Sequence, residues 1–261
     1  MKREMSVNGA FYPNEEKDIL KYFNHFNNII DEHIKLPDIQ TKAVIVPHAG
    51  YVYSGFSANI AYRILQNSGV KRFVVIGPSH KVAFKGSTLC EFENYITPLG
   101  NINADKQLYK LLKEKFKLPC FKEVFKEHST EVQFPFIKHY IKDASIVELI
   151  YSDENPSNLS KIIEFILDLE DVGVIISTDL SHFYDLKKAN ELDNICIEAI
   201  EKLDTSLLDS GCEACGKRGV WGVVDVARKK QLSPLVLDYR TSADVSGDKS
   251  RVVGYLSVAF M

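Results

Sequence analysis

A single α/β domain over residues 1–261, with a central and mostly parallel sheet flanked by helices, is the fold class that the sequence predicts. Short runs rich in valine and isoleucine alternate with segments of helical periodicity, which is typical of parallel strands joined by crossover helices. The clearest unit is a strand at 43–47, a helix at 56–67 and a second strand at 72–76. No internal repeat or linker-like change of composition divides the 261 residues, which are enough for one large core.

Local signals define the other elements of the first half of the chain. Asn14 is a candidate cap for a helix through about residue 33, in which apolar residues recur at helical spacing. The strand at 43–47 ends at Pro47, because proline has no N–H to donate to a neighbouring strand. Gly69 is of the type that ends helices. Further elements are expected as a strand at 86–92, a helix at 104–116 and a strand at 121–125.

The second half of the chain continues the alternation of strands and helices. Ser129 and Thr130 are candidate caps for a helix through residue 140. Apolar runs and amphipathic spacing then predict the remaining elements. These are strands at 145–150, 172–177, 233–240 and 251–259, and helices at 156–167, 187–202, 204–210 and 219–230.

The composition is ordinary for a folded protein and excludes several classes. The chain is 45% hydrophobic and 26% charged, and its net charge of -3 provides no basic surface for nucleic acid. No stretch approaches the roughly 20 apolar residues that a membrane span needs. The first residues lack the apolar segment of a signal peptide. We therefore expect a cytoplasmic protein that binds neither nucleic acid nor membranes.

The five cysteines do not form a recognisable disulfide pattern. Their odd number in a chain of this size disfavours a disulfide framework, so Cys90, Cys120 and Cys196 are expected to be free buried thiols. Cys212-x-x-Cys215 is half of a structural zinc site without the second half. It is either a redox dithiol or a pair of small buried residues, and we favour the second for Cys212. Cys215 precedes a glycine and a helix, and is the better candidate for a reactive thiol in a cleft.

The main functional signal is that a histidine follows three separate apolar strands. His48, His80 and His182 all occupy such positions. The carboxyl ends of parallel strands form the edge where open α/β sheets bind ligands, so the three side chains are expected to converge. Neutral imidazole is a common ligand of zinc, copper and iron. Asp179 could orient His182 from behind, or His182 could act as a general acid or base in place of a ligand.

Other polar clusters have two interpretations each. His128 stands between Glu127 and Glu131, either as a functional group or as part of a hydrogen-bond network at a helix start. Asp244 and Asp248 lie in a loop that is either a turn or the source of a carboxylate ligand or base. The absence of GxxxxGK[ST], GxGxxG and GxSxG disfavours common nucleotide enzymes and α/β hydrolases. Surface positions on helices are expected for His25, His33 and His139.

A series of short motifs runs in order along nearly the whole chain. The motifs are Val-Asn-Gly-Ala-Phe-Tyr-Pro at 7–13, Val-Pro-His-Ala-Gly-Tyr at 46–51, Gly-Pro-Ser-His at 77–80, Glu-His-Ser-x-Glu at 127–131, Ser-Thr-Asp-Leu-Ser-His at 177–182 and Cys-Gly at 215–216. Together they resemble the Memo family (mediator of cell motility), and the closing Tyr-x-Thr-Ser-x-Asp-x-x-Gly-Asp at 239–248 resembles its microbial branch. The resemblance implies a single α/β domain similar to the LigB-like class III extradiol dioxygenases, which are non-haem iron enzymes, with a metal-sized pocket at the sheet edge.

The resemblance also implies roles for individual residues and partners. His48 and His80 match the histidines shared with the dioxygenase metal site, and His182 matches a third pocket histidine. Animal members take a third ligand from a cysteine in the last loop, where this chain has Val245. We hypothesise that Asp244 completes the site instead. Members are metal binders with redox activity and, in animals, signalling adaptors; microbial members are linked to AMMECR-type and radical-SAM proteins.

Together these observations predict a metal-dependent, dioxygenase-like oxidoreductase. Iron would be bound by His48, His80 and Asp244, with copper, zinc or no metal as alternatives. His182 would move protons while Asp179 holds it, and Glu131 and Cys215 would line the pocket. Two other functions stay open. One is a non-catalytic module that holds a small molecule or peptide in the same pocket, and the other is a thiol-based or hydrolytic enzyme that uses Cys215 with a nearby histidine.

Overall fold

An eleven-stranded mixed sheet runs through the centre of the computed structural model, which describes residues 1–261. Its five central strands are parallel, each bonded to the next in the order β6-β7-β3-β8-β2. The expectation of a mostly parallel central sheet in an α/β fold is therefore confirmed. The strands are β6 (Ile102–Ala104), β7 (Ser145–Tyr151), β3 (Arg72–Pro78), β8 (Val172–Ser177) and β2 (Ala43–Val46).

Antiparallel and short strands extend both edges of this parallel centre. Beyond β2, β11 (Val252–Phe260) runs antiparallel and pairs with β10 (Pro234–Thr241). Beyond β6, β5 (Asn94–Tyr95) runs antiparallel and carries β1 (Lys2–Arg3) at the outer edge. Two further strands pair off the main path: β4 (Ser87–Thr88) with β7, and β9 (His182–Tyr184) with β11.

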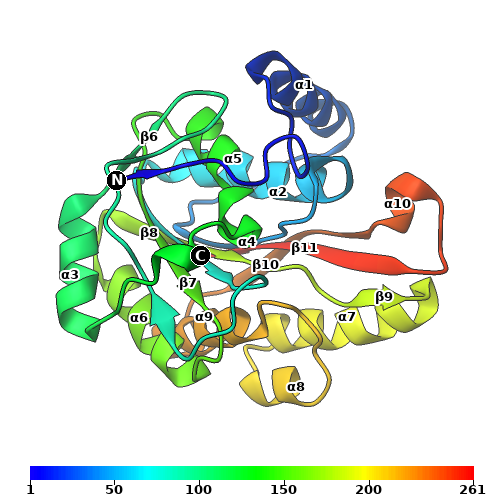
Figure 1. The fold of residues 1–261 in the computed structure, drawn as a ribbon. Helices are drawn as coiled ribbons and strands as arrows, with labels where there is room; N and C mark the ends of the chain where they lie inside the picture. Colours follow the sequence, from blue (N-terminus) through cyan, green and yellow to red (C-terminus); the bar gives the residue numbers. More distant parts are fainter.

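Helices cover both faces of the sheet and make three layers (Figure 1). Alternate side chains of each central strand point to opposite faces, so Val44 and Val75 enter one apolar core while Ile45 and Val74 enter the other. The two cores contain 33 and 35 buried residues. One face carries α1 (Glu16–His33), α2 (Tyr51–Leu65) and α5 (Phe134–Tyr140); the other carries α3 (Lys106–Phe116), α6 (Pro156–Asp168), α7 (Leu186–Glu201), α8 (Thr205–Asp209) and α9 (Lys217–Lys230).

The remaining helical segments are short. They are the 3-10 turns η1 (Gln66–Ser68) and η2 (Lys122–Val124), and the single-turn helices α4 (His128–Glu131) and α10 (Ala243–Ser246). None of the helices is both long enough and apolar enough to cross a membrane.

Five segments differ from their sequence-based predictions. The helix expected from Ser129 or Thr130 through residue 140 is divided into α4 and α5, and Glu127 caps α4. The N-cap of α1 is Glu15 and not Asn14. Helix α2 begins at Tyr51 and not at residue 56, because the Gly50 carbonyl already accepts hydrogen bonds from the next turn. The strands expected at 86–92 and 121–125 are mostly irregular, and residues 122–124 form η2. The physical reason is that these two segments bond to each other outside the sheet: Leu89 N donates to Pro119 O.

The cysteines also correct the sequence-based prediction. Cys90 is bonded to Cys120, and Cys196 is bonded to Cys212, so the expectation of free thiols at Cys90, Cys120 and Cys196 is wrong. Each pair has its Cα atoms 4.8 Å apart although its members are 30 or 16 residues apart in the chain. Folding alone creates this proximity. Cys215 is the free cysteine, so Cys212 and Cys215 do not form the dithiol considered above.

Loss of the Cys90–Cys120 disulfide is expected to destabilise the protein without changing the fold. The double variant Cys90→Ser, Cys120→Ser should lose about 2–4 kcal/mol of unfolding free energy, because the unfolded chain is no longer cross-linked. Urea unfolding without reductant measures this loss, and Cys215→Ser is the matched control that should lose much less. Thiol titration of the wild type, denatured without reductant, should find the one free thiol. A titration of all five cysteines would contradict both disulfides.

Candidate metal centre

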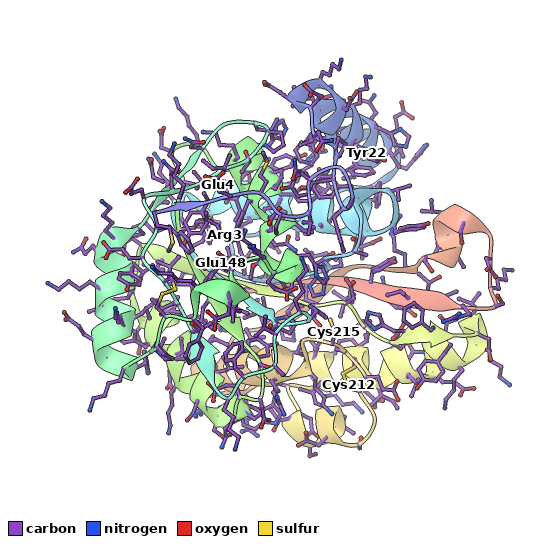
Figure 2. All side chains as sticks on the ribbon, viewed as in Figure 1. Arg3, Glu4, Tyr22, Glu148, Cys212 and Cys215 are labelled. Atoms are coloured by element: carbon purple, nitrogen blue, oxygen red, sulfur yellow. A yellow bond between two sulfur atoms is a disulfide. The ribbon has the colours of Figure 1, made fainter.

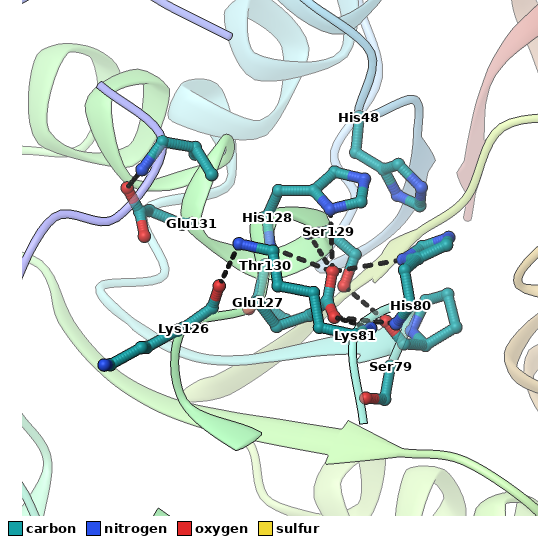
Figure 3. Close-up of polar contacts among 12 residues, drawn as sticks. His48, Ser79, His80, Lys81, Lys126, Glu127, His128, Ser129, Thr130 and Glu131 are labelled. Carbon is teal, nitrogen blue, oxygen red and sulfur yellow. Dashed lines mark hydrogen bonds and ion pairs between the residues drawn. The ribbon is translucent and has the colours of Figure 1, made fainter. Parts of the chain in front are cut away.

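Three histidine side chains meet at one edge of the sheet. They belong to His48, His80 and His128, and one ring nitrogen from each lies within 4.8 Å of the others (Figure 3). The ring centroids of His80 and His128 are 4.5 Å apart, and that of His48 is 5.2 Å from the first and 5.4 Å from the second. This group could hold a metal ion.

The order of the strands explains why His48 and His80 converge. His48 follows the carboxyl end of β2 and His80 follows the carboxyl end of β3, and β8 lies between these two strands. Because all three strands are parallel, their carboxyl ends share one edge of the sheet. The end of β8 contributes Ser177, whose Oγ lies 3.0 Å from Nδ1 of His48. His128 comes from a different source, the first turn of α4.

The buried carboxylate of Glu127 holds the other two histidines. Its Oε1 is 2.8 Å from Nδ1 of His128 and 3.1 Å from Nδ1 of His80. Its Oε2 accepts a hydrogen bond of 2.7 Å from the backbone N–H of His80, and its Oε1 caps the start of α4 by accepting from the N–H groups of His128 and Ser129. One side chain therefore fixes the loop after β3 and the start of α4 together.

The pKa of Glu127 keeps it ionised at neutral pH. Burial raises this pKa, but hydrogen bonds from His128 and His80 outweigh the effect and hold it far below its ordinary value. An ionised carboxylate only accepts hydrogen bonds, so Nδ1 of both histidines must carry the proton. Each ring then presents Nε2 as the nitrogen that is free to bind a metal.

His48 reaches the same tautomer through Ser177. The Ser177 hydroxyl donates to the carbonyl of Ser129, so its oxygen is left to accept from Nδ1–H of His48. Burial lowers the pKa of His48 well below its ordinary value, and positive charge on His80 or His128 lowers it further. His48 is therefore a neutral imidazole whose Nε2 carries no proton, the form that binds metals.

Cys215 and Asp179 lie next to His48 but outside the three-histidine group. The Cys215 Sγ is 3.3 Å from Nε2 of His48, and burial, with the nearby Asp179 carboxylate, raises the pKa of this thiol to about 12. Asp179 accepts a hydrogen bond of 2.7 Å from the backbone N–H of His48. Burial raises the pKa of Asp179 as well. Both groups thus buttress the loop that carries His48 and keep a protonated thiol at the edge of the site.

Three other predicted site residues are placed elsewhere. His182 is half-buried on β9, opposite Val253 of β11, and no hydrogen bond joins it to Asp179. Glu131 is buried on α4 and accepts hydrogen bonds from the N–H groups of Ser6 and Val7 and from the hydroxyl of Tyr12, so it anchors the N-terminal segment.

Asp244, the predicted third ligand, is not a member of the histidine group. It lies on α10, at the outer end of the β10–β11 hairpin (Figure 1), and its carboxylate accepts a hydrogen bond of 2.7 Å from the backbone N–H of Thr241. His128 completes the group instead. His128 does not fit the pattern of a histidine after a strand, because it begins a helix. Its position between Glu127 and Glu131 was the signal in the sequence that it has polar partners.

The fold and the site define an α/β protein with a histidine group that could hold a metal ion. Sequence comparison identifies the family: the profile of the Memo-like protein family matches residues 3–259. The chain belongs to the Memo family. It is 35% identical to the MEMO1 family protein of Sulfurisphaera tokodaii, with 100% of this chain and 99% of the relative covered. It is 32% identical to that of Aquifex aeolicus, with 99% of each covered, and 32% identical to that of Methanobrevibacter smithii, with 100% of each covered.

Removing the charge of Glu127 should weaken metal binding. In Glu127→Gln the neutral amide accepts the two Nδ1–H groups more weakly, and its NH2 group cannot accept the backbone N–H of His80 that Oε2 accepts. The rings of His80 and His128 are then held less firmly, and affinity should fall about 10- to 100-fold. Zinc titration of metal-free protein by calorimetry measures the change. Glu123→Gln, at an exposed position just upstream, is the matched control and should bind as the wild type does. Equal affinity in both variants would remove Glu127 from the metal centre.

The stability of metal-free protein should decrease in mild acid because of His48. The pKa of His48 is lower in the folded protein than in the unfolded chain, so the unfolded chain takes up the proton first as the pH falls. The contribution of His48 to the free energy of unfolding is therefore complete above about pH 6.5, and below it falls by up to roughly 1.4 kcal/mol per pH unit. Urea unfolding between about pH 7.5 and about pH 5.5 measures how the free energy of unfolding changes with pH, and this slope should be shallower for His48→Asn than for the wild type. The exposed His25→Asn should keep the wild-type slope, and a shared slope for all three proteins would contradict the assignment.

Proposed function

We propose that this Memo family protein is a metal-dependent oxidoreductase with dioxygenase-like chemistry. The observation that supports it is that one ring nitrogen from each of His48, His80 and His128 lies within 4.8 Å of the others, while Ser177 and Glu127 form hydrogen bonds with their Nδ1 atoms. Three imidazole ligands leave coordination positions open for a substrate and dioxygen. The supporting shell of hydrogen bonds is what metal-binding histidines require.

Iron is the metal that we propose for this site. Imidazole ligands also suit zinc and copper, so the choice follows the resemblance to non-haem iron dioxygenases. Bound iron would supply activation of dioxygen and of the substrate. The protein would orient the ligands, exclude water on the buried side of His48, and provide a proton donor in the Cys215 thiol.

His182 and Asp179 keep their proposed role in proton movement. A positive charge on His182 stabilises the ionised form of Asp179, which indicates that the two side chains lie close enough to interact electrostatically. Asp179 in turn bonds to the backbone of His48. We infer that His182 works beside the histidine group and does not belong to it.

A thiol enzyme that uses Cys215 with His48 is less well supported. The Sγ–Nε2 distance of 3.3 Å is suitable for proton transfer. However, the raised pKa of Cys215 and the lowered pKa of His48 both oppose a thiolate–imidazolium pair. Cys215 therefore remains a neutral thiol and His48 a neutral imidazole, and a neutral imidazole is the form of histidine that binds metals.

Metal analysis of variants purified without oxygen tests the proposed ligand set. His128→Ala should lose most of the iron, because it removes one of three ligands, whereas Asp244→Ala should retain the wild-type amount. His139→Ala, outside the group, controls for the loss of an arbitrary histidine. Circular dichroism confirms that each variant is folded. Iron retained in His128→Ala and lost in Asp244→Ala would replace the proposed ligand set with the one predicted from the sequence.

Oxygen uptake by the iron-loaded protein tests the activity separately. A panel of catechols should include at least one compound that drives oxygen consumption, and His80→Ala should abolish it. Iron bound at one equivalent with no oxygen uptake across the panel would leave the metal centre intact and contradict the oxidoreductase function. That result would favour the non-catalytic binding module.

A further inference from the structure

An open cleft of about 400 Å³ lies next to the histidine group. It contains Cys215, whose Sγ is 3.3 Å from His48, and Ser79, which directly precedes His80. Figure 2 shows Cys215 towards the middle of the molecule, above the disulfide-bonded Cys212. The cleft is lined by the carboxyl ends of β3 and β7 and by the segment that leads into α9: Pro78, Ser79, Tyr151, Ser152, Asp153, Ala214, Cys215, Lys217 and Arg218.

The charges of this cleft leave one cation without a partner. Arg218 donates a hydrogen bond of 2.9 Å to Oδ1 of Asp153 and one of 2.6 Å to the carbonyl of Ser152. The charges of Arg218 and Asp153 therefore neutralise each other. Lys217 is half-buried, and no carboxylate of the chain forms an ion pair with its ammonium group. The cleft therefore has a net positive charge from Lys217, directly beside the site where a cationic metal would bind.

We propose that this cleft binds a small organic anion, a carboxylate of metabolite size, whose acid group is held by Lys217 while its other end faces Cys215, the residue that contacts His48. This inference rests on the proposed function and names the substrate class of that site. The ammonium group of Lys217 would provide a charge-assisted hydrogen bond, the stronger kind of polar contact. Ser79 and Ser152 add polar lining that suits an acid better than a hydrocarbon.

The cleft differs from the other hollows of the surface because it contains Cys215, whose Sγ lies 3.3 Å from His48. Its volume of about 400 Å³ lies near the lower end of small-molecule sites, which favours a small molecule as the occupant. The hollow between residues 9–13 and 50–53 has a similar volume but no charged residue, so it cannot select an anion. The hollow that contains Lys85, Lys117 and Lys161 is basic, and so is the one that contains Lys122 and Lys126, but neither includes Cys215.

Binding of benzoate and of its neutral counterpart benzamide to metal-free protein tests the anion site. NMR titration of the wild type should give roughly tenfold tighter binding for benzoate, the difference expected for one charge-assisted hydrogen bond. Lys217→Met should remove this preference, Lys217→Arg should keep it, and Lys161→Met, in the other basic hollow, should not change it. Equal binding of the two compounds to the wild type, or a preference that Lys161→Met removes and Lys217→Met keeps, would overturn the proposal.

Cobalt-substituted protein tests whether the anion is placed at the metal centre. Benzoate should change the visible absorption of bound cobalt(II) in the wild type but not in Lys217→Met, while both proteins bind the same amount of cobalt. Benzoate that binds without altering the spectrum would show a cleft unconnected to the metal and would overturn the assignment as substrate site. Failure of the wild type to bind cobalt would instead contradict the proposed function, and the benzoate preference in metal-free protein would still be measurable.

Discussion

The buried carboxylate of Glu127 is the constraint on which the candidate site depends. It accepts hydrogen bonds from the backbone of the loop after β3, from the start of α4 and from the rings of His80 and His128. A buried charge is costly unless it is fully hydrogen-bonded, and here the donors that satisfy it are the groups that must be positioned. Because these donors satisfy the buried anion, Glu127 also fixes the positions of two imidazoles in the group that could hold a metal ion.

Helix α4 is held from its opposite side by a second buried network. Arg3 lies 3.0 Å from Glu131 and 3.0 Å from Glu148, and it also donates to the carbonyl of Glu127 (Figure 2 labels Arg3 and Glu148). Burial raises the pKa of Glu148 in spite of this partner. Removing one member of such a network leaves an unpaired buried charge, so the N-terminal segment, far from the histidines in sequence, is part of their support. The ring of Phe11, 4.5 Å from that of His128, closes the same side.

Much of the fold could be predicted because its signals are local. The β-branched runs of β2, β3 and β8 are buried on both faces, as the absence of alternation in them indicates, and Pro47 ends the strand pairing where expected. The irregular segment at 86–92 was not predictable from propensity, since it forms hydrogen bonds with residues 119–121: Leu89 N donates to Pro119 O, and Phe121 N donates to the Thr88 hydroxyl. The pairing of Cys90 with Cys120 has the same origin.

By itself the sequence determined that the central strands β2, β3 and β8 exist and that His48 and His80 follow two of them, because apolar strand runs and the strand-ending proline act over a few residues. Only the tertiary structure decided that His128 joins them and that Asp244 does not, since α4 is held at the sheet edge by residues distant in the chain: Arg3 bonds to Glu127, 124 positions away, and Ser177 bonds to Ser129, 48 positions away. The tautomers that leave each Nε2 free were likewise decided by partners distant in the chain. The amino-acid sequence fixes which residues are neighbours along a strand. The hydrogen bonds that satisfy a buried polar group form only after folding has brought segments distant in the chain together.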